Sequence, residues 1–252
     1  MRDRAPATAP SAASGCSARC STSAAAAALL PALGCLLLGV GAVPISPWRV
    51  IGAVVGPGIA SDGAIIWGLR LPLPFQLNHI NVWLLEEANQ YTLVDTGVGL
   101  PDVQAIWAGL SEKLFKNKPL GRIIVTHAHP DHIGMAAPLA RQHQVPVHIS
   151  ATEYFFTRAM CAGVPGLDAE TGSRFMASHG LQGEASEETK RVRGNLFTKL
   201  VPGPPLSYLR MQHDDVLQIG GHDWRCVAGY GHSPEHISLV CESLGLMISG
   251  DM

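Results

Sequence analysis

The sequence predicts a layered fold of the α/β or α+β class. Strand-like and helix-like segments alternate along much of the chain, which is typical of helices packed on a sheet. Of its 252 residues, 47% are hydrophobic and 15% are charged, so the chain can form a substantial core. The net charge of −2 gives no sign that nucleic acid or an anionic membrane is a partner.

The globular part begins with three strand patterns and an amphipathic helix. The apolar runs 64–71, 80–85 and 91–94 are bounded by polar turns or prolines, as strands are. From Pro101 onward, apolar residues recur at helical spacing, at positions Val103, Ile106, Trp107, Leu110 and Leu114. We therefore expect a helix here with one apolar face on the sheet.

A buried strand, a helix and a short strand are expected next. The apolar segment 122–125 predicts the buried strand, which leads into a cluster of histidines. We expect the helix at about 133–141 and the short strand at 145–149. This order of elements completes the alternation that predicts the layered fold.

A capping-box pattern opens another helix, at roughly 152–161. Ser150 is expected to accept a hydrogen bond from the Glu153 amide, and the Glu153 side chain to reach back to the Ser150 amide. Periodicity then weakens, and the chain is rich in glycine and charge up to about residue 212. We expect a helical insertion at about 152–212, acting either as a lid over a site or as a solvated structural loop.

Strand patterns return in the last part of the chain. Val216 and Ile219, followed by Gly220-Gly221, predict a hairpin into a strand at 224–227. Residues 237–241 and 246–249 predict another pair of strands. These segments form the end of the predicted domain, 61–252.

Residues 1–60 differ in composition and are excluded from the fold prediction. They contain one acidic residue, Asp3, and an uncharged run from Ala24 to Val43 that follows three arginines. This low-complexity extension is open to four interpretations: a secretory signal, a transit peptide, an uncleaved membrane anchor, or sequence that is not native. We expect the domain itself to be cytoplasmic; a genuine targeting segment in residues 1–43 would instead direct it to export or to an organelle.

The segment T-H-A-H-P-D-H, residues 126–132, contains a cluster of metal-ligand residue types. His127, His129, Asp131 and His132 fall within six residues, directly after the predicted buried strand. Imidazole nitrogens and carboxylate oxygens suit Zn²⁺ and similar ions. In extended backbone, alternate residues point the same way, so the spacing favours a metal site.

Two distant residues are the best candidates to complete this site. His232 lies on a glycine-flanked loop after a predicted strand, and we expect it to join His127 and His129 as the third ligand of one metal. Asp131 and His132 would then face a second metal, with Asp251 as a bridge. Two metals about 3.5–4 Å apart would share a hydroxide and polarise a scissile bond.

Four motifs in order make the chain resemble the metallo-β-lactamase-fold hydrolases over about residues 64–252. They are T-H-A-H-P-D-H, G-H-S-P-E-H at 231–236, Asp95-Thr96-Gly97, and Gly250-Asp251. The resemblance implies a four-layer αββα sandwich with a dinuclear zinc site at one edge. It assigns His127, His129 and His232 to the first metal, Asp131 and His132 to the second, and Asp251 to both. It also implies that Asp95 supports the metal loops and that His236 is supportive and not a ligand.

The resemblance also predicts an incomplete C-terminus. Family members supply a further histidine to the second metal some tens of residues after the Gly-Asp motif, and the printed sequence ends at Met252. We expect the last strands and helix of the sandwich to be missing, so that this chain would bind the second metal weakly.

The expected reaction is zinc-dependent hydrolysis of an acyl bond in a small molecule, such as a thioester or a lactone. Asp131 would orient the attacking hydroxide as well as bind metal. The form of the motif is most similar to the hydroxyacylglutathione hydrolase and lactonase branches. A nuclease of the same fold lacks support from the charge, and a di-iron oxygen-reducing protein usually carries Glu where His129 stands. A non-catalytic metal-binding fragment is a further alternative, and oligomeric state is not predicted.

Overall fold

A computed structural model describes residues 64–75, 77–181, 183–184, 190 and 196–252 of the chain. The predicted extension, residues 1–60, lies outside these residues, as does part of the predicted insertion. The boundaries drawn for the domain and its insertion therefore stay predictions. Within the described residues, no helix is long and apolar enough to cross a membrane.

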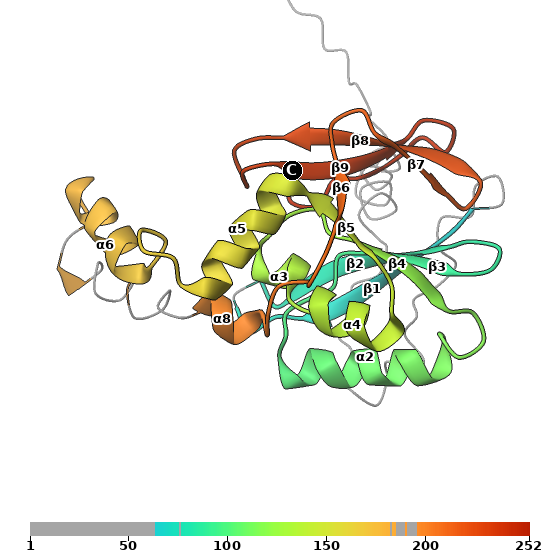
Figure 1. Cartoon of the computed structure of the whole chain (residues 1–252), viewed down its shortest axis with the longest axis horizontal. Coiled ribbons are helices and arrows are strands. Elements are labelled where there is room, and N and C mark those ends of the chain that lie inside the picture. The colour runs from blue at the N-terminus through green and yellow to red at the C-terminus, as the bar shows by residue number, and fades with distance from the viewer. Residues whose placement is uncertain (1–63, 76, 182, 185–189, 191–195) are drawn as a thin grey trace, which may run out of the picture. The chain divides into compact units, whose positions relative to one another are not determined.

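A six-stranded mixed sheet forms the first layer of strands (Figure 1). Its order follows the chain: β1 (Ile65–Pro72), β2 (His79–Glu86), β3 (Tyr91–Val94), β4 (Leu120–Ile124), β5 (Val147–Ser150) and β6 (Leu209–Met211). The first three strands are antiparallel, whereas β3 to β6 are parallel. The carboxyl ends of the parallel strands therefore lie at one edge, where loops can bring polar side chains together.

The described helices follow the predicted order. They are α2 (Pro101–Lys113), α3 (Pro130–Ile133), α4 (Ala136–His143), α5 (Ala151–Ala162), α6 (Ala169–Ser178) and α8 (Leu196–Leu200). Figure 1 shows α2 and α4 on the face of the first sheet that points away from the second. The predicted apolar stripe of α2 is confirmed, because Val103, Ile106, Trp107 and Leu110 are buried.

The second sheet is antiparallel and packs against the first (Figure 1). Its order is β10 (Leu246–Ile248), β9 (His236–Cys241), β8 (His222–Gly229) and β7 (Val216–Ile219). The residues buried between the sheets include Ile66, Leu85, Val94 and Ile124 from the first, and Trp224, Cys226, Ile237 and Leu239 from the second. The described residues thus supply one helical layer and both sheets of the predicted αββα sandwich.

The helix predicted at 133–141 is present as α4 but begins later, at Ala136, and the short helix α3 precedes it with a break between the two. The Met135 amide leaves the helical pattern: it donates to Gly97 O at 3.1 Å and to Thr96 Oγ1 at 3.1 Å. These contacts tie the break to the loop after β3. These long-range contacts interrupt the helix, and helical periodicity alone does not reveal them.

Two further predictions need correction. Residues 209–211 form strand β6 inside the segment expected to be helical; three residues are too few to show a strand pattern, and Met211 is buried by its pairing with β5. The capping box is only half formed. Ser150 Oγ accepts from the Glu153 amide at 3.4 Å, but the Glu153 carboxylate is hydrogen-bonded to Ala128, Ser233 and Glu235 instead of Ser150.

Gly134 allows a test of the close contact between the α3–α4 segment and the loop after β3. A Cβ there would lie 2.5 Å from Pro130 O and 2.6 Å from Gly97 O. We expect Gly134→Ala to lower the free energy of unfolding by about 1–3 kcal/mol, because backbone must move to make room. Urea denaturation of the metal-free protein measures this change.

The matched control is Gly109→Ala in α2. A Cβ at Gly109 would meet nothing within 4 Å, and alanine favours the helix. This variant should therefore be more stable than the wild type by about 0.5–1 kcal/mol. Equal effects of the two substitutions would contradict the described contact.

Candidate metal centre

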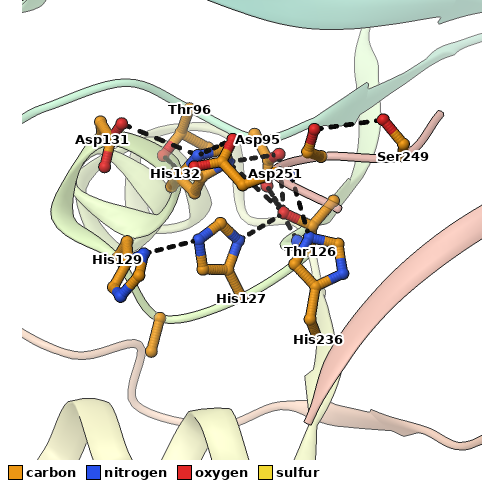
Figure 2. A network of polar contacts seen from close by, with 12 residues as sticks. Asp95, Thr96, Thr126, His127, His129, Asp131, His132, His236, Ser249 and Asp251 are labelled. Carbon is orange, nitrogen blue, oxygen red and sulfur yellow. Dashed lines mark hydrogen bonds and ion pairs between the residues drawn. The ribbon is translucent and has the colours of Figure 1, made fainter. Parts of the chain in front are cut away.

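The predicted site residues come together at one end of the two sheets. Asp95 follows β3, His127 and His129 follow β4, and Asp131 and His132 lie in α3. The second sheet supplies His232 after β8, His236 at the start of β9 and Asp251 after β10. Figure 2 shows most of these side chains pointing toward one another.

Three histidines converge on one point. His127 Nε2 lies 2.9 Å from His129 Nδ1 and 3.2 Å from His232 Nε2. Asp251 Oδ2 lies 3.3 Å from His232 Nε2, and all four residues offer ligand atoms within 4.8 Å of one another. Nitrogen atoms that face one another at such distances need either a shared proton or a cation between them. The donor set, three imidazoles and a carboxylate, fits a divalent transition-metal ion.

A second group lies beside the first. It contains Asp131, His132 and Asp251, whose ligand atoms are also within 4.8 Å of one another. His132 Nε2 lies 3.7 Å from Asp131 Oδ2 and 3.2 Å from Asp251 Oδ1. The two carboxylate oxygens of Asp251 thus face different groups.

Two buried nitrogen atoms of the site, His132 Nε2 and His236 Nδ1, have no hydrogen-bond partner of good geometry among the described residues. His132 Nε2 lies 3.2 Å from Asp251 Oδ1. Buried polar atoms nearly always have a partner. A divalent cation between His132 and the two aspartates would supply one.

Hydrogen bonds fix the tautomers of two ligand candidates. Thr126 Oγ1 donates its proton to Asp95 Oδ2 at 2.9 Å. It also lies 3.0 Å from His127 Nδ1 and, having no second proton, can only accept a hydrogen bond from that nitrogen. Likewise, His132 Nδ1 donates to Asp95 Oδ2 at 2.8 Å. In the neutral rings, both Nε2 atoms then carry lone pairs that face the candidate metal positions.

The pKa values of the first group favour neutral imidazoles. Burial and the surrounding histidines hold the pKa of His127 far below its usual range. Burial, then His232, lowers the pKa of His129, and contact with His132 lowers the pKa of Asp251. Neutral histidines and an ionised aspartate are the protonation states that bind metal.

His132 behaves in the opposite way. Burial alone would lower the pKa of His132, but the charge of Asp95 and the proximity of Asp251 and Asp131 raise it to about 10. Without metal, a proton on His132 therefore balances part of the negative charge of three aspartates. A bound cation would take over this balance.

Asp95 is the buried brace of the site. Its backbone has φ 63°, a left-handed conformation that Asp tolerates better than most residues. Asp95 Oδ1 accepts from the Thr126 amide at 2.8 Å, and Oδ2 accepts from His132. Asp95 thus contacts the loop that carries the histidines (Figure 2), and its supporting role toward a metal stays a prediction.

Sequence reasoning missed the neutral residues of this brace. Thr96 donates to His132 O through both its amide and its Oγ1, each at 2.8 Å. Trp107 Nε1 donates to Thr96 O at 2.8 Å and so ties α2 to the loop. Thr126, next to the first histidine, was visible in the motif, but nothing in the sequence marked its hydroxyl as the link to Asp95.

His236 lies next to the ligand candidates, with its ring centroid 4.7 Å from that of His127, but belongs to neither candidate group. It is fully buried, and its Nε2 accepts from the Asp251 amide at 3.3 Å. A Cβ at Gly250 would lie 2.4 Å from His236 Nε2, so glycine is needed for this approach. His236 therefore positions the Gly250-Asp251 turn, in line with its predicted supportive role.

A cavity of about 270 Å³ opens beside the second group. Its lining includes Asp131, His132 and Asp251 together with the apolar residues Ile80, Trp83 and Ile248. A molecule in this cavity would touch both the candidate metal ligands and an apolar wall.

Two layers of strands with a histidine–aspartate cluster at one edge define a layered α/β fold with a candidate metal centre. The family model described as the metallo-beta-lactamase superfamily matches residues 76–252. The chain belongs to this superfamily.

Individual relatives agree with this assignment. The chain is 25% identical over 175 residues to a probable metallo-hydrolase, YflN, of Bacillus subtilis (strain 168), covering 68% of this chain and 60% of that protein. It is similar to the crystal structure of a beta-lactamase domain protein from Burkholderia ambifaria, with 35% identity and a TM-score of 0.61 over 73% of this chain and 51% of that one. A metallo-beta-lactamase family protein from Thermus thermophilus gives 26% identity and a TM-score of 0.57, over 73% of this chain and 58% of that one. The chain thus spans between half and three fifths of the length of these relatives.

Asp95→Asn tests the brace. The amide nitrogen of asparagine cannot accept a hydrogen bond, so Thr126 or His132 loses its acceptor. We expect the free energy of unfolding of the metal-free protein to fall by about 1–3 kcal/mol, as measured by urea denaturation. Glu112→Gln removes the same charge from the exposed surface of α2 and should change stability by less than about 0.5 kcal/mol. A wild-type midpoint for Asp95→Asn would contradict the bracing role.

Proposed function

We propose that the chain is the metal-binding part of a zinc-dependent hydrolase that cleaves an acyl bond of a small molecule. The observation that carries this proposal is the placement of Asp251 between two groups of ligands, with one carboxylate oxygen toward each. His127, His129 and His232 would hold one ion, and Asp131 and His132 the other. Asp251 would contribute to both.

The choice of zinc rests on the ligand types. Three imidazoles around one position suit zinc better than magnesium or calcium, which prefer oxygen. When bound, zinc ions supply Lewis acidity: they polarise a carbonyl and activate water at neutral pH.

Asp131 is the candidate catalytic residue among the protein groups. Its side chain is 23% exposed, and it lines the cavity next to His132. A carboxylate in this position can orient a water molecule and accept its proton. The apolar cavity wall would exclude bulk water from the substrate.

A small-molecule substrate agrees with the size of the cavity and with the net charge of the whole chain. The cavity is close to the lower size limit of common ligand pockets, about 300 Å³. The net charge of −2 offers no surface that would track a phosphate backbone, so a nuclease has less support. Thioesters and lactones, the substrates of the branches named above, are the first compounds to test. The cytoplasm stays our expectation for the site of action.

His129→Ala is the direct test of the first metal position. We expect the variant to lose zinc and thioester or lactone turnover together, by more than the roughly 10–100-fold typical of residues that only support a ligand. Metal content is measured by elemental analysis and turnover with a panel of both substrate types. His179→Ala removes an exposed histidine of another region and should leave both unchanged. Wild-type zinc content in His129→Ala would refute the site, and zinc without any turnover in the wild type would favour a non-catalytic metal-binding chain.

Deleting residues 1–60 tests the exclusion of the N-terminal extension. None of the ligand candidates lies in this segment, so the shortened protein should bind zinc with wild-type affinity. A competition titration with a chromophoric chelator measures the affinity. Loss of zinc from the shortened protein would show that the extension contributes to the site.

A further inference from the structure

Glu153 is a buried carboxylate that the proposed chemistry does not use. It lies in the first turn of α5 and is fully buried. Among the described residues, no lysine, arginine or histidine forms an ion pair with it. A buried carboxylate without an ion-pair partner is costly unless hydrogen bonds stabilise it.

The contacts of Glu153 lead to both metal loops. Its Oε2 accepts from the Ala128 amide at 2.8 Å, and Ala128 stands between His127 and His129. Its Oε1 accepts from Ser233 Oγ and from the Glu235 amide, each at 2.6 Å. Every partner is a donor, which matches the acceptor-only character of an ionised carboxylate.

These loops come from different sheets and are about a hundred residues apart in the chain. On their other side, the Ile237 amide donates to Thr126 O at 2.9 Å. Ser150 Oγ adds a bond to Glu235 O at 3.0 Å. The Glu153 carboxylate is thus a second link between the two loops. Its partners Ala128 and Ser233 are direct sequence neighbours of the candidate ligands.

We infer that Glu153 is a positioning residue, which holds His127 and His129 in register with His232 so that three nitrogens meet around one metal ion. This inference rests on the proposed metal site. Each of the two carboxylate oxygens serves one loop, so the distance between the loops is set by one rigid group. The carboxylate therefore acts on the ligands through the backbone and Ser233, without contacting the metal position itself.

The test compares metal binding in Glu153→Gln with the wild type. Glutamine keeps the size of the side chain, but its NH₂ group faces a donor in one of the two loops and repels it. We expect Co²⁺ and Zn²⁺ to bind about 10–100-fold more weakly, and the visible spectrum of the Co²⁺ protein to change in intensity. Affinity is measured by chelator competition on metal-free protein that circular dichroism shows to be folded.

Two variants keep the test sharp. Glu112→Gln changes an exposed carboxylate of α2, away from both loops, and should bind metal like the wild type. Ser233→Ala removes one donor and leaves the Glu153 charge in place, so it should weaken metal binding in the same direction by a smaller factor. If Glu153→Gln does not fold, the metal affinity of Ser233→Ala tests the positioning role instead.

The outcomes separate this inference from the proposed function. Wild-type affinity and Co²⁺ spectrum in Glu153→Gln, or in Ser233→Ala where the first variant is unfolded, would overturn the positioning role. A variant that is less stable yet binds metal as tightly when folded would show a merely structural residue, which also overturns it. A wild-type protein that binds neither ion would refute the metal site and the inference together.

Discussion

The structure of the site depends on the pairing of buried carboxylates with hydrogen-bond donors from distant loops. Asp95, at the end of β3, is the central case: it holds the Thr126 amide and hydroxyl and the His132 ring. Through Thr126 it also sets the orientation of the His127 ring. One acidic side chain in a left-handed backbone conformation therefore fixes how two ligand candidates present their lone pairs.

Sheet geometry explains why these residues meet at all. Parallel strands β3 and β4 end at the same edge, so the loops after them are neighbours. The second sheet, packed on the first, contributes the loops that carry His232 and Asp251. Because each of these residues follows a strand in the sequence, their convergence could be predicted from the sequence once the strands were placed. The eight predicted site residues do lie together in the structure, and their roles as ligands stay proposals.

Other features could not be predicted, because the same local sequence pattern is compatible with two different local structures. Ser150 and Glu153 have the spacing of a capping box, yet the carboxylate turns toward Ala128 and Ser233, which no local rule can foresee. The break between α3 and α4 lies at Gly134 and Met135, and contacts with the loop after β3 hold it in place. Strand β6 is too short to show alternation. In each case a partner far away in the chain decides the local structure.

Four acidic residues at the site divide into two kinds, and the division follows from their hydrogen bonds. Asp95 and Glu153 are almost fully buried, and both oxygens of each carboxylate accept from protein donors. Asp131 and Asp251 are partly exposed, with side chains 23% and 39% accessible, and each has an oxygen near a histidine nitrogen of the centre. A carboxylate whose oxygens are occupied by donors has little capacity left for a metal, whereas a carboxylate at the cavity keeps it. The same residue type thus serves as brace or as ligand, and the number of donors around it decides which.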